Sequence, residues 1–221
     1  MSVRDNIKAI EEKLPQGVSL VAVSKFHGPE RILEAYSAGL RIFAESRPQE
    51  FAAKVPQLPA DIEWHFIGHL QTNKLKLVLP YAKLIQSVDS FHLLEAIDSW
   101  AVANGRVVDV LLELHLGAEE TKQGFSEEEI IRIVSETSSF PEMFPGIRIR
   151  GLMGMATNTD DMTVVEKDFE RIEALFNRIR AFGLEGFDQL SIGMSADWPV
   201  AVRHGATMVR IGTDIFGPRE Y

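Results

Sequence analysis

Short apolar runs alternate with amphipathic segments along the whole chain, and this alternation constrains the fold more than any other feature. Eight runs are bounded by polar residues or glycine and have the pattern of β-strands. They are Val18–Ser24, Leu40–Ala44, Glu63–Ile67, Leu84–Val88, Val107–Leu114, Ile147–Met153, Gln189–Ile192 and Thr207–Ile211. Strands that alternate with helices form parallel βαβ units. Eight units in 221 residues predict a closed (β/α)8 TIM barrel, with a doubly wound open sheet as the alternative.

The segments between these runs carry helix signals. Pro29–Ala38 begins with a proline in the first turn, and Ser90–Ala103 begins with a capping serine. Ser126–Glu136 opens with a capping box, and Val164–Phe182 is the longest amphipathic segment. The proline-containing stretch Val55–Ala60 is interpreted as a loop between a helix and a strand. We therefore expect one domain over residues 1–221.

Charge and composition exclude several classes of protein. The net charge is −9, which disfavours non-specific binding to nucleic acid. The chain has no cysteine, so disulfides, thiolate nucleophiles and cysteine-based zinc sites are excluded. Its first residues form a charged amphipathic pattern unlike a signal peptide, and no apolar run approaches the roughly 20 residues of a membrane span. We expect a cytoplasmic protein without a membrane partner.

Lys25 directly follows the first predicted strand. In a barrel, functional groups gather where strands end, and strand parity puts Val21, Val23 and Lys25 on one side. If that side faces the interior, the lysine is partly desolvated, which lowers its pKa and frees the amine to attack an aldehyde. A solvent-facing lysine at a strand end is the alternative, and Lys25 alone does not decide between them.

The loops after the seventh and eighth predicted strands have the composition of a phosphate site. The first reads Gly193-Met194-Ser195, and the second contains Gly212-Thr213. These two loops form the usual phosphate site of this fold. The hydroxyl groups can donate to a phosphate, the glycines allow close approach of backbone amides, and a predicted helix over Ala196–His204 would begin just after Ser195. Simple turn formation explains either loop by itself, but the pair predicts phosphate binding.

Arg210 interrupts the apolar run of the last predicted strand. A charge inside a core is costly unless it is paired, so the guanidinium needs an acceptor in the barrel mouth. A pyridine nitrogen is one candidate, and a carboxylate in a structural ion pair is the other.

Two further groups are weaker candidates for site residues. His65 and His69 are four residues apart, but they lie where a strand runs into a glycine turn and no third ligand is evident. A hydrogen-bonding or packing role is favoured over a metal site. Lys122 follows the fifth predicted strand and is a candidate second amine, although a solvated loop charge is the simpler interpretation.

Seven motifs between Leu20 and Gly217 occur in the order found in a known family. They are Ala22–Lys25, Trp64–Lys74, Ser87–Asp89, Glu119–Gly124, Arg150–Met153, Gly193–Ser195, and Met208–Thr213 with Ile215–Gly217. By these motifs the chain resembles the pyridoxal phosphate homeostasis proteins, whose barrel is similar to the N-terminal domain of alanine racemase.

The resemblance implies a site for pyridoxal 5'-phosphate (PLP). It implies that Lys25 carries PLP as a Schiff base, that Ser195, Gly212 and Thr213 hold the phosphate, and that Arg210 approaches the ring nitrogen. Arginine at this nitrogen would keep the ring unprotonated and weaken PLP as an electron sink. The candidate cofactor-binding residues are thus Lys25, Gly193, Met194, Ser195, Arg210, Gly212 and Thr213, with no metal and no established catalytic residue.

The chain departs from the family pattern at three positions. Ala44 and Ser46 stand where the family has glycine and asparagine after the second strand, and His115 stands where it has asparagine. These positions are expected near the pocket rim, so the departures concern contacts to the ring or to an amino-acid ligand.

The leading functional hypothesis is a PLP-binding protein of vitamin B6 homeostasis that holds PLP and releases it to apo-enzymes. A low-activity amino-acid racemase is the alternative, but alanine racemase uses a second domain and an opposing tyrosine. That domain is not expected here, and Tyr36, Tyr81 and Tyr221 offer no obvious second base. A barrel enzyme that acts on a phosphorylated sugar without PLP is a third hypothesis. We expect a monomer.

Overall fold

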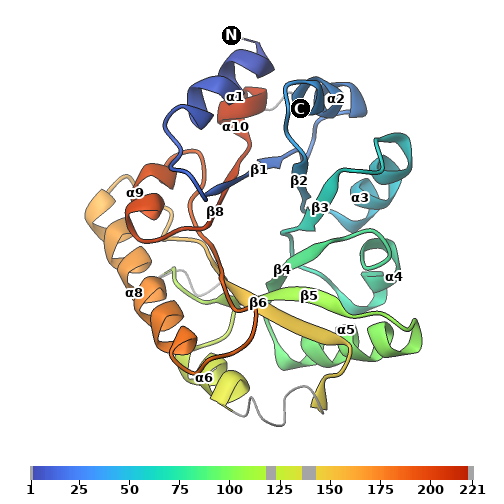
Figure 1. The fold of residues 1–221 in the computed structure, drawn as a ribbon, viewed down its shortest axis with the longest axis vertical. Coiled ribbons are helices and arrows are strands. Elements are labelled where there is room, and N and C mark those ends of the chain that lie inside the picture. Colours follow the sequence, from blue (N-terminus) through green and yellow to red (C-terminus); the bar gives the residue numbers. More distant parts are fainter. Residues whose placement is uncertain (1, 118–122, 136–142, 219–221) are drawn as a thin grey trace.

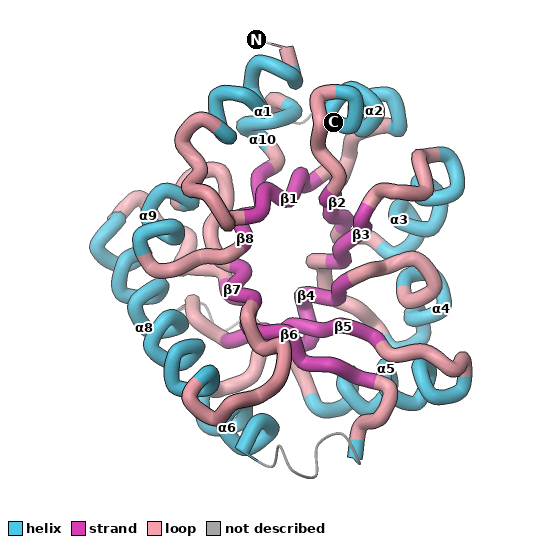
Figure 2. The backbone as a smooth tube through the Cα atoms, viewed as in Figure 1, coloured by secondary structure: helices cyan, strands magenta, loops and turns pink. Residues whose placement is uncertain are grey.

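The computed structural model describes residues 2–117, 123–135 and 143–218, and their strands form one closed barrel. The eight strands are all parallel, each pairs with the next along the chain, and β8 closes the barrel against β1 (Figures 1 and 2). They are β1 Ser19–Val23, β2 Ile42–Glu45, β3 Glu63–Phe66, β4 Leu84–Val88, β5 Val108–Leu114, β6 Ile147–Gly154, β7 Gln189–Ser191 and β8 Met208–Ile211. The predicted barrel is confirmed, and the open sheet is excluded.

Helices surround the barrel on its outer side (Figure 2). The α-helices are α1 Val3–Glu11, α2 Pro29–Ser37, α3 Pro48–Lys54, α4 Leu75–Val78, α5 Phe91–Ala103, α6 Glu127–Ser135, α8 Met162–Arg180, α9 Trp198–Arg203 and α10 Thr213–Phe216. Among the described residues, the short 3-10 helices η1 Val55–Gln57 and η2 Thr72–Lys74 lie in the connections before β3 and α4. No helix in the described part of the chain is long and apolar enough to cross a membrane.

The capping residues that mark helix starts in the sequence act as expected. The side chain of Ser90 accepts a hydrogen bond from the backbone of Leu93 at 3.3 Å. Ser126 and Glu129 form the predicted capping box, with reciprocal bonds of 2.8 and 3.2 Å. The long helix begins two residues earlier than predicted, at Met162, because Asp161 caps it through a 2.9 Å bond from the Thr163 amide.

The predicted start of the helix after the seventh strand is also wrong, in the opposite direction. The helix after β7 begins at Trp198, two residues later than the expected Ala196. The backbone amides of Asp197 and Trp198 both donate to the carbonyl of Met194, and this tight turn delays the helix. Ser195 therefore lies in a turn that precedes α9, and does not lie at the start of the helix.

The buried apolar residues in the described part of the chain form two hydrophobic cores. The larger one lies between the barrel wall and the outer helices. The smaller one fills the barrel and includes Val21, Val23, Ala44, Leu111 and Met153. Because side chains alternate across a strand, these positions identify the residues of each strand that face the interior. Val21 and Val23 face inward, as strand parity required for Lys25 to emerge at the rim of the barrel.

Candidate functional site

The loops after β1, β7 and β8 meet at the carboxyl end of the barrel. The backbone amide of Arg210, in β8, donates to the carbonyl of Gly193 at 2.9 Å, which joins the loop after β7 to the last strand. A Cβ atom at Gly212 would lie 3.2 Å from the carbonyl oxygen of Val23, two residues before Lys25. The candidate lysine and both candidate phosphate loops are thus neighbours in space, as the sequence predicts.

The segment that carries Lys25 is held in a strained backbone conformation. Lys25 is half-buried, and the next residue, Phe26, has a φ of 70°. A bulky residue rarely adopts positive φ unless its surroundings enforce it. The backbone amide of Phe26 donates to Glu50 at 2.8 Å, and the guanidinium of Arg47 lies 4.3 Å from the centre of its ring. These contacts from the start of α3 set the direction in which the lysine leaves the strand.

A buried ionic cluster supports this segment from the side of β2 and α3. The ammonium group of Lys54 donates to the carbonyl of Ser24 at 3.0 Å, to Glu45 at 2.9 Å and to Glu50 at 2.6 Å. The hydroxyl of Ser24 also donates to Glu45, at 2.6 Å. Burial raises the pKa of Glu45 despite the nearby ammonium, and its Oε2 atom has no partner among the described residues. This cluster is not evident in the sequence, because its members come from separate elements of the chain.

The loop after β7 depends on glycine. Gly193 has a φ of 92°, and a Cβ atom there would lie 2.6 Å from that of Ala201. Asp197 accepts a 2.6 Å bond from the backbone amide of Met194, which closes the turn. Within the described residues, the hydroxyls of Ser195 and Thr213 make no hydrogen bond, and neither do the backbone amides of Ser195, Thr213 and Asp214. These donors at neighbouring loops are the groups that an anion requires.

Arg210 is only 4% exposed and is held by oxygen atoms of other strands. Its Nη1 donates to the carbonyl and to the hydroxyl of Ser191 at 2.7 and 2.6 Å, and its Nη2 donates to the carbonyl of Gly154 at 3.0 Å. In the described part of the chain it has no carboxylate within ion-pair distance, so the structural ion pair that the sequence left open is wrong. Three of the five N–H groups of the guanidinium are engaged, which leaves two for a ligand.

A chain of hydrogen bonds runs from Arg210 through the barrel to His65. Since arginine can only donate, the hydroxyl of Ser191 accepts from it and gives its own proton to Oε1 of Gln86, at 2.6 Å. This fixes the amide of Gln86 so that Nε2 donates to Nδ1 of His65, at 2.8 Å. His65 is then neutral with its proton on Nε2, in agreement with burial, which lowers its pKa to about 4.

Two buried carboxyl groups near Arg210 are absent from the site residues predicted from the sequence. Glu113 is 7% exposed on β5, and burial together with the charge of Asp89 raises its pKa to about 7. Burial also raises the pKa of Asp197. Both charges act back on Arg210, but burial dominates and lowers its pKa to about 10. Side chains alternate along Val108–Leu114, so Glu113 shares a face with Leu111, which points into the barrel. This alternation is the sequence signal that could have placed Glu113 in the barrel interior.

The remaining candidates have different surroundings. Nδ1 of His69 contacts Asp89 at 3.0 Å, and Nδ1 of His65 contacts Gln86. The two histidine rings thus have different hydrogen-bond partners. Ala44 faces the barrel interior, and His115 is half-buried after β5. The backbone of Ser46 packs so closely on Gly68 that no side chain fits at position 68. Lys122 and Tyr221 lie outside the described residues.

A cavity of about 180 Å³ extends the site between the loops after β6 and β7. Its walls include Met155, Thr157, Met194 and Asp197. Met194 is the one candidate from the sequence that lines this cavity, and its side chain is exposed. Space for a small ligand group therefore exists beside the Ser195 turn.

Known proteins resemble this chain over nearly its whole length. The family model described as alanine racemase, N-terminal domain, matches residues 1–220. A pyridoxal phosphate homeostasis protein of Aquifex aeolicus is 38% identical over 203 residues, which are 91% of this chain and 87% of that protein.

The solved structures of PipY from Synechococcus elongatus share the fold. The structure without PLP has a TM-score of 0.91 and 33% identity, and covers 98% of this chain and 100% of its own. The structure with PLP bound covers the same shares, 98% and 100%, with a TM-score of 0.86 and 32% identity.

These matches confirm the resemblance read from the seven motifs and the fold expected from it. The extent of the family model and the identity to full-length relatives place the chain without ambiguity. This chain belongs to the alanine racemase N-terminal domain family and, within it, to the pyridoxal phosphate homeostasis proteins.

Proposed function

We propose that this chain binds PLP at the carboxyl end of its barrel, with Lys25 as the Schiff-base lysine, and that it serves vitamin B6 homeostasis. The observation that carries the proposal is that the loops after β1, β7 and β8 meet at the carboxyl end of the barrel. There they bring Lys25 and the unengaged hydroxyls of Ser195 and Thr213 close to the buried Arg210. Family membership and the PLP-bound structure of PipY support the choice of ligand.

PLP supplies an aldehyde that reacts reversibly with primary amines, and a pyridine ring that acts as an electron sink when protonated. Lys25 provides the amine, and the strained turn at Phe26 sets its direction. Ser195 and Thr213 provide hydroxyls and amides for the phosphate. Arg210 offers the ring nitrogen only donors, and its bonds to Ser191 and Gly154 prevent it from turning away.

The surroundings favour holding PLP over turnover. The hydroxyl of Tyr36 donates to Asp61 at 2.8 Å, just before β3, and so lies toward the opposite end of the barrel from Lys25. Tyr81 is exposed in the connection before β4, at that same end. Neither of these tyrosines can serve as a second base across the site from Lys25. We therefore favour a carrier that delivers PLP to apo-enzymes over a racemase.

The phosphate contacts are tested by the double variant Ser195→Ala/Thr213→Val. Charge-assisted hydrogen bonds contribute roughly 1.5–3 kcal/mol each, so we expect PLP affinity to fall by at least about tenfold. Equilibrium dialysis measures the affinity, and Ser37→Ala/Thr163→Val, which removes exposed hydroxyls elsewhere, is the matched control. Equal affinity of the two double variants would remove these residues from the site.

Delivery is tested by the return of activity to an apo-PLP enzyme mixed with the loaded protein. We expect transfer to be faster than spontaneous release, measured by dilution into a PLP scavenger. Transfer that only matches spontaneous release would overturn delivery and leave binding intact. An α-proton exchange from alanine in deuterated buffer that depends on Lys25 would instead support the racemase.

A further inference from the structure

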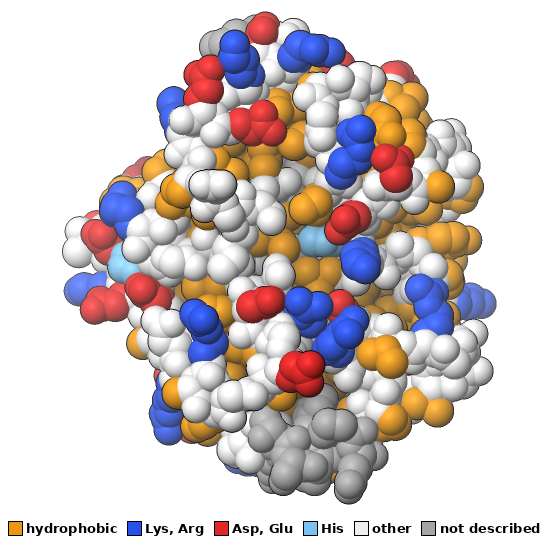
Figure 3. Space-filling view, in the orientation of Figure 1, with side chains coloured by type: hydrophobic (Ala, Val, Ile, Leu, Met, Phe, Trp, Pro, Cys, Tyr) orange, Lys and Arg blue, Asp and Glu red, His pale blue; other side chains and the backbone are white. Residues whose placement is uncertain are grey.

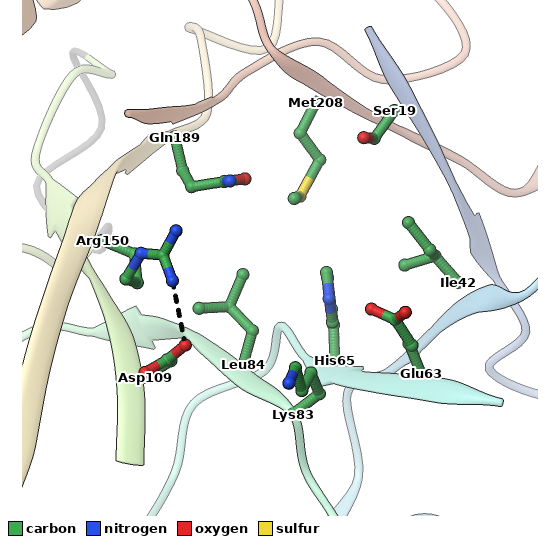
Figure 4. A pocket seen from close by; sticks show the side chains of 10 residues that line it. All are labelled: Ser19, Ile42, Glu63, His65, Lys83, Leu84, Asp109, Arg150, Gln189 and Met208. Atoms are coloured by element: carbon green, nitrogen blue, oxygen red, sulfur yellow. Dashed lines mark hydrogen bonds and ion pairs between the residues drawn. The ribbon is translucent and has the colours of Figure 1, made fainter. Parts of the chain in front are cut away.

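A second cavity lies at the other end of the barrel, where the strands begin. Its volume is about 240 Å³, and its lining includes Glu63, His65, Lys83, Asp109 and Arg150. Figure 4 shows these side chains arranged around the opening, with the apolar side chains of Ile42, Leu84 and Met208 among them. Figure 3 shows acidic, basic and histidine side chains around the middle of this face. The barrel separates this cavity from the Lys25 loop.

His65 supplies a hydrogen-bond donor to this cavity. It is only 3% exposed and points from β3 into the ring of lining residues (Figure 4). The hydrogen-bond chain from Arg210 assigns its proton to Nε2, and this N–H has no protein partner among the described residues. Nε2 is not among the described side-chain atoms that are sealed from solvent without a partner, so this N–H faces the cavity and can donate to an acceptor that enters it.

Charges of both signs flank this donor. Lys83 and Glu63 are exposed, and neither forms an ion pair in the described part of the chain. Glu63 lies two residues before His65 on the same face of β3, and the positive charge of Lys83 helps to lower the pKa of His65, so both are close to the ring. Across the opening, Arg150 is already paired with Asp109 at 3.3 Å.

We propose that this cavity is a second binding site, for a small zwitterionic amino acid. The ligand carboxylate accepts from Nε2–H of His65 and from the ammonium group of Lys83, and its protonated amine donates to Glu63. The apolar floor leaves room for a short aliphatic side chain. None of its residues belongs to the loops around Lys25, and the hydrogen-bond chain through Gln86 is the link from His65 to Arg210.

The test uses N,N-dimethylglycine as the probe. It has the carboxylate and a protonated amine, but as a tertiary amine it cannot form a Schiff base with PLP at the other end. Long-range ¹⁵N–¹H spectra of the full chain follow Nε2 of His65 during the titration. We expect a saturable shift of this resonance, and acetate, which lacks the amine, should bind at least about fivefold more weakly.

Variants at the exposed rim keep the fold and test the assignment. Lys83→Met and Glu63→Gln should each weaken binding of the probe by roughly tenfold, as expected for the loss of one charge-assisted bond. Lys76→Met and Glu95→Gln, which change exposed charges on α4 and α5, should leave the affinity unchanged. A titration without a saturable His65 shift, equal affinity for acetate, or equal effects of rim and control variants would overturn the proposal.

Discussion

The buried carboxyl group of Glu113 makes the stability of the folded protein depend on pH. Its carboxyl group is buried near Arg210 without a hydrogen bond from the described residues, and its pKa is raised to about 7. A raised carboxyl pKa means that the folded protein binds this proton more tightly than the unfolded chain. The resulting stability is complete below the unfolded pKa of about 4.5 and is lost as the pH rises through 7.

Glu113→Gln should therefore stabilise the protein at pH 8 and have little effect at pH 4.5. The gain at pH 8 has an upper value of about 3 kcal/mol, since each pKa unit corresponds to about 1.4 kcal/mol. Urea unfolding at the two pH values measures the difference. Glu128→Gln, at an exposed position of α6, is the control. An equal effect of Glu113→Gln at both pH values would show that folding does not raise the pKa of this carboxyl.

At the scale of elements, α3 positions the loop after β1 through the buried cluster of Lys54. The cluster links Ser24, Glu45 and Glu50 and reaches the residues on both sides of Lys25. Removing one partner of a buried ion pair leaves an uncompensated charge, whereas removing both is far less costly.

Lys54→Met should destabilise the protein by about 3–5 kcal/mol, because Glu45 is then left buried with only Ser24 as a partner. The double variant Lys54→Met/Glu45→Gln should recover at least half of this loss. Urea unfolding of both single variants and the double variant completes the cycle. Strict additivity of the two single effects would contradict the coupling inferred for the cluster.

The turn between β7 and α9 offers a second test at this scale. Gly193 and Gly17 have nearly equal φ values, 92° and 91°, but only Gly193 has atoms within 4 Å of the position that a Cβ atom would occupy. Gly17→Ala thus reports the strain of positive φ alone, roughly 1 kcal/mol. Gly193→Ala adds a clash with Ala201 and should cost about 1–3 kcal/mol more. Similar unfolding free energies would show that the turn after β7 adapts easily.

Most elements could be predicted from local pattern, and the exceptions have physical causes. The run Leu84–Val88 matches β4 at both ends, because apolar side chains and flanking breaks define a buried strand locally. The start of α9 was missed because the backbone amides of Asp197 and Trp198 both donate to the Met194 carbonyl and form a turn. The hydrophobic periodicity of the sequence does not reveal such a turn.

Part of the candidate site could likewise be predicted from the sequence, and part could not. Lys25 and the glycine loops follow strands and could be located from the chain alone. The raised pKa of Glu113 and the path from Arg210 to His65 depend on which strands are neighbours across the barrel, and so required the fold.

At the scale of the whole molecule, two groups of polar and charged side chains lie at opposite ends of the barrel. The carboxyl ends of the strands gather Lys25, Ser195, Arg210 and Thr213, and the opposite end gathers His65 with its flanking charges. A line of hydrogen bonds through the interior connects the two ends and fixes the side chains at both. The hydrogen bonds from Arg210 to Ser191 and Gly154 thus tie the proposed PLP site to the neighbouring strands β7 and β6.

Borohydride reduction of the PLP-loaded protein, followed by peptide mass mapping, tests the central claim most directly. Reduction converts a Schiff base into a stable bond at the lysine that formed it, so the modified peptide identifies the residue. We predict the label on Lys25 in the wild-type chain and its loss in Lys25→Arg, with Lys76→Arg labelled like the wild type. Label on any other lysine, or undiminished labelling of Lys25→Arg, would contradict the account.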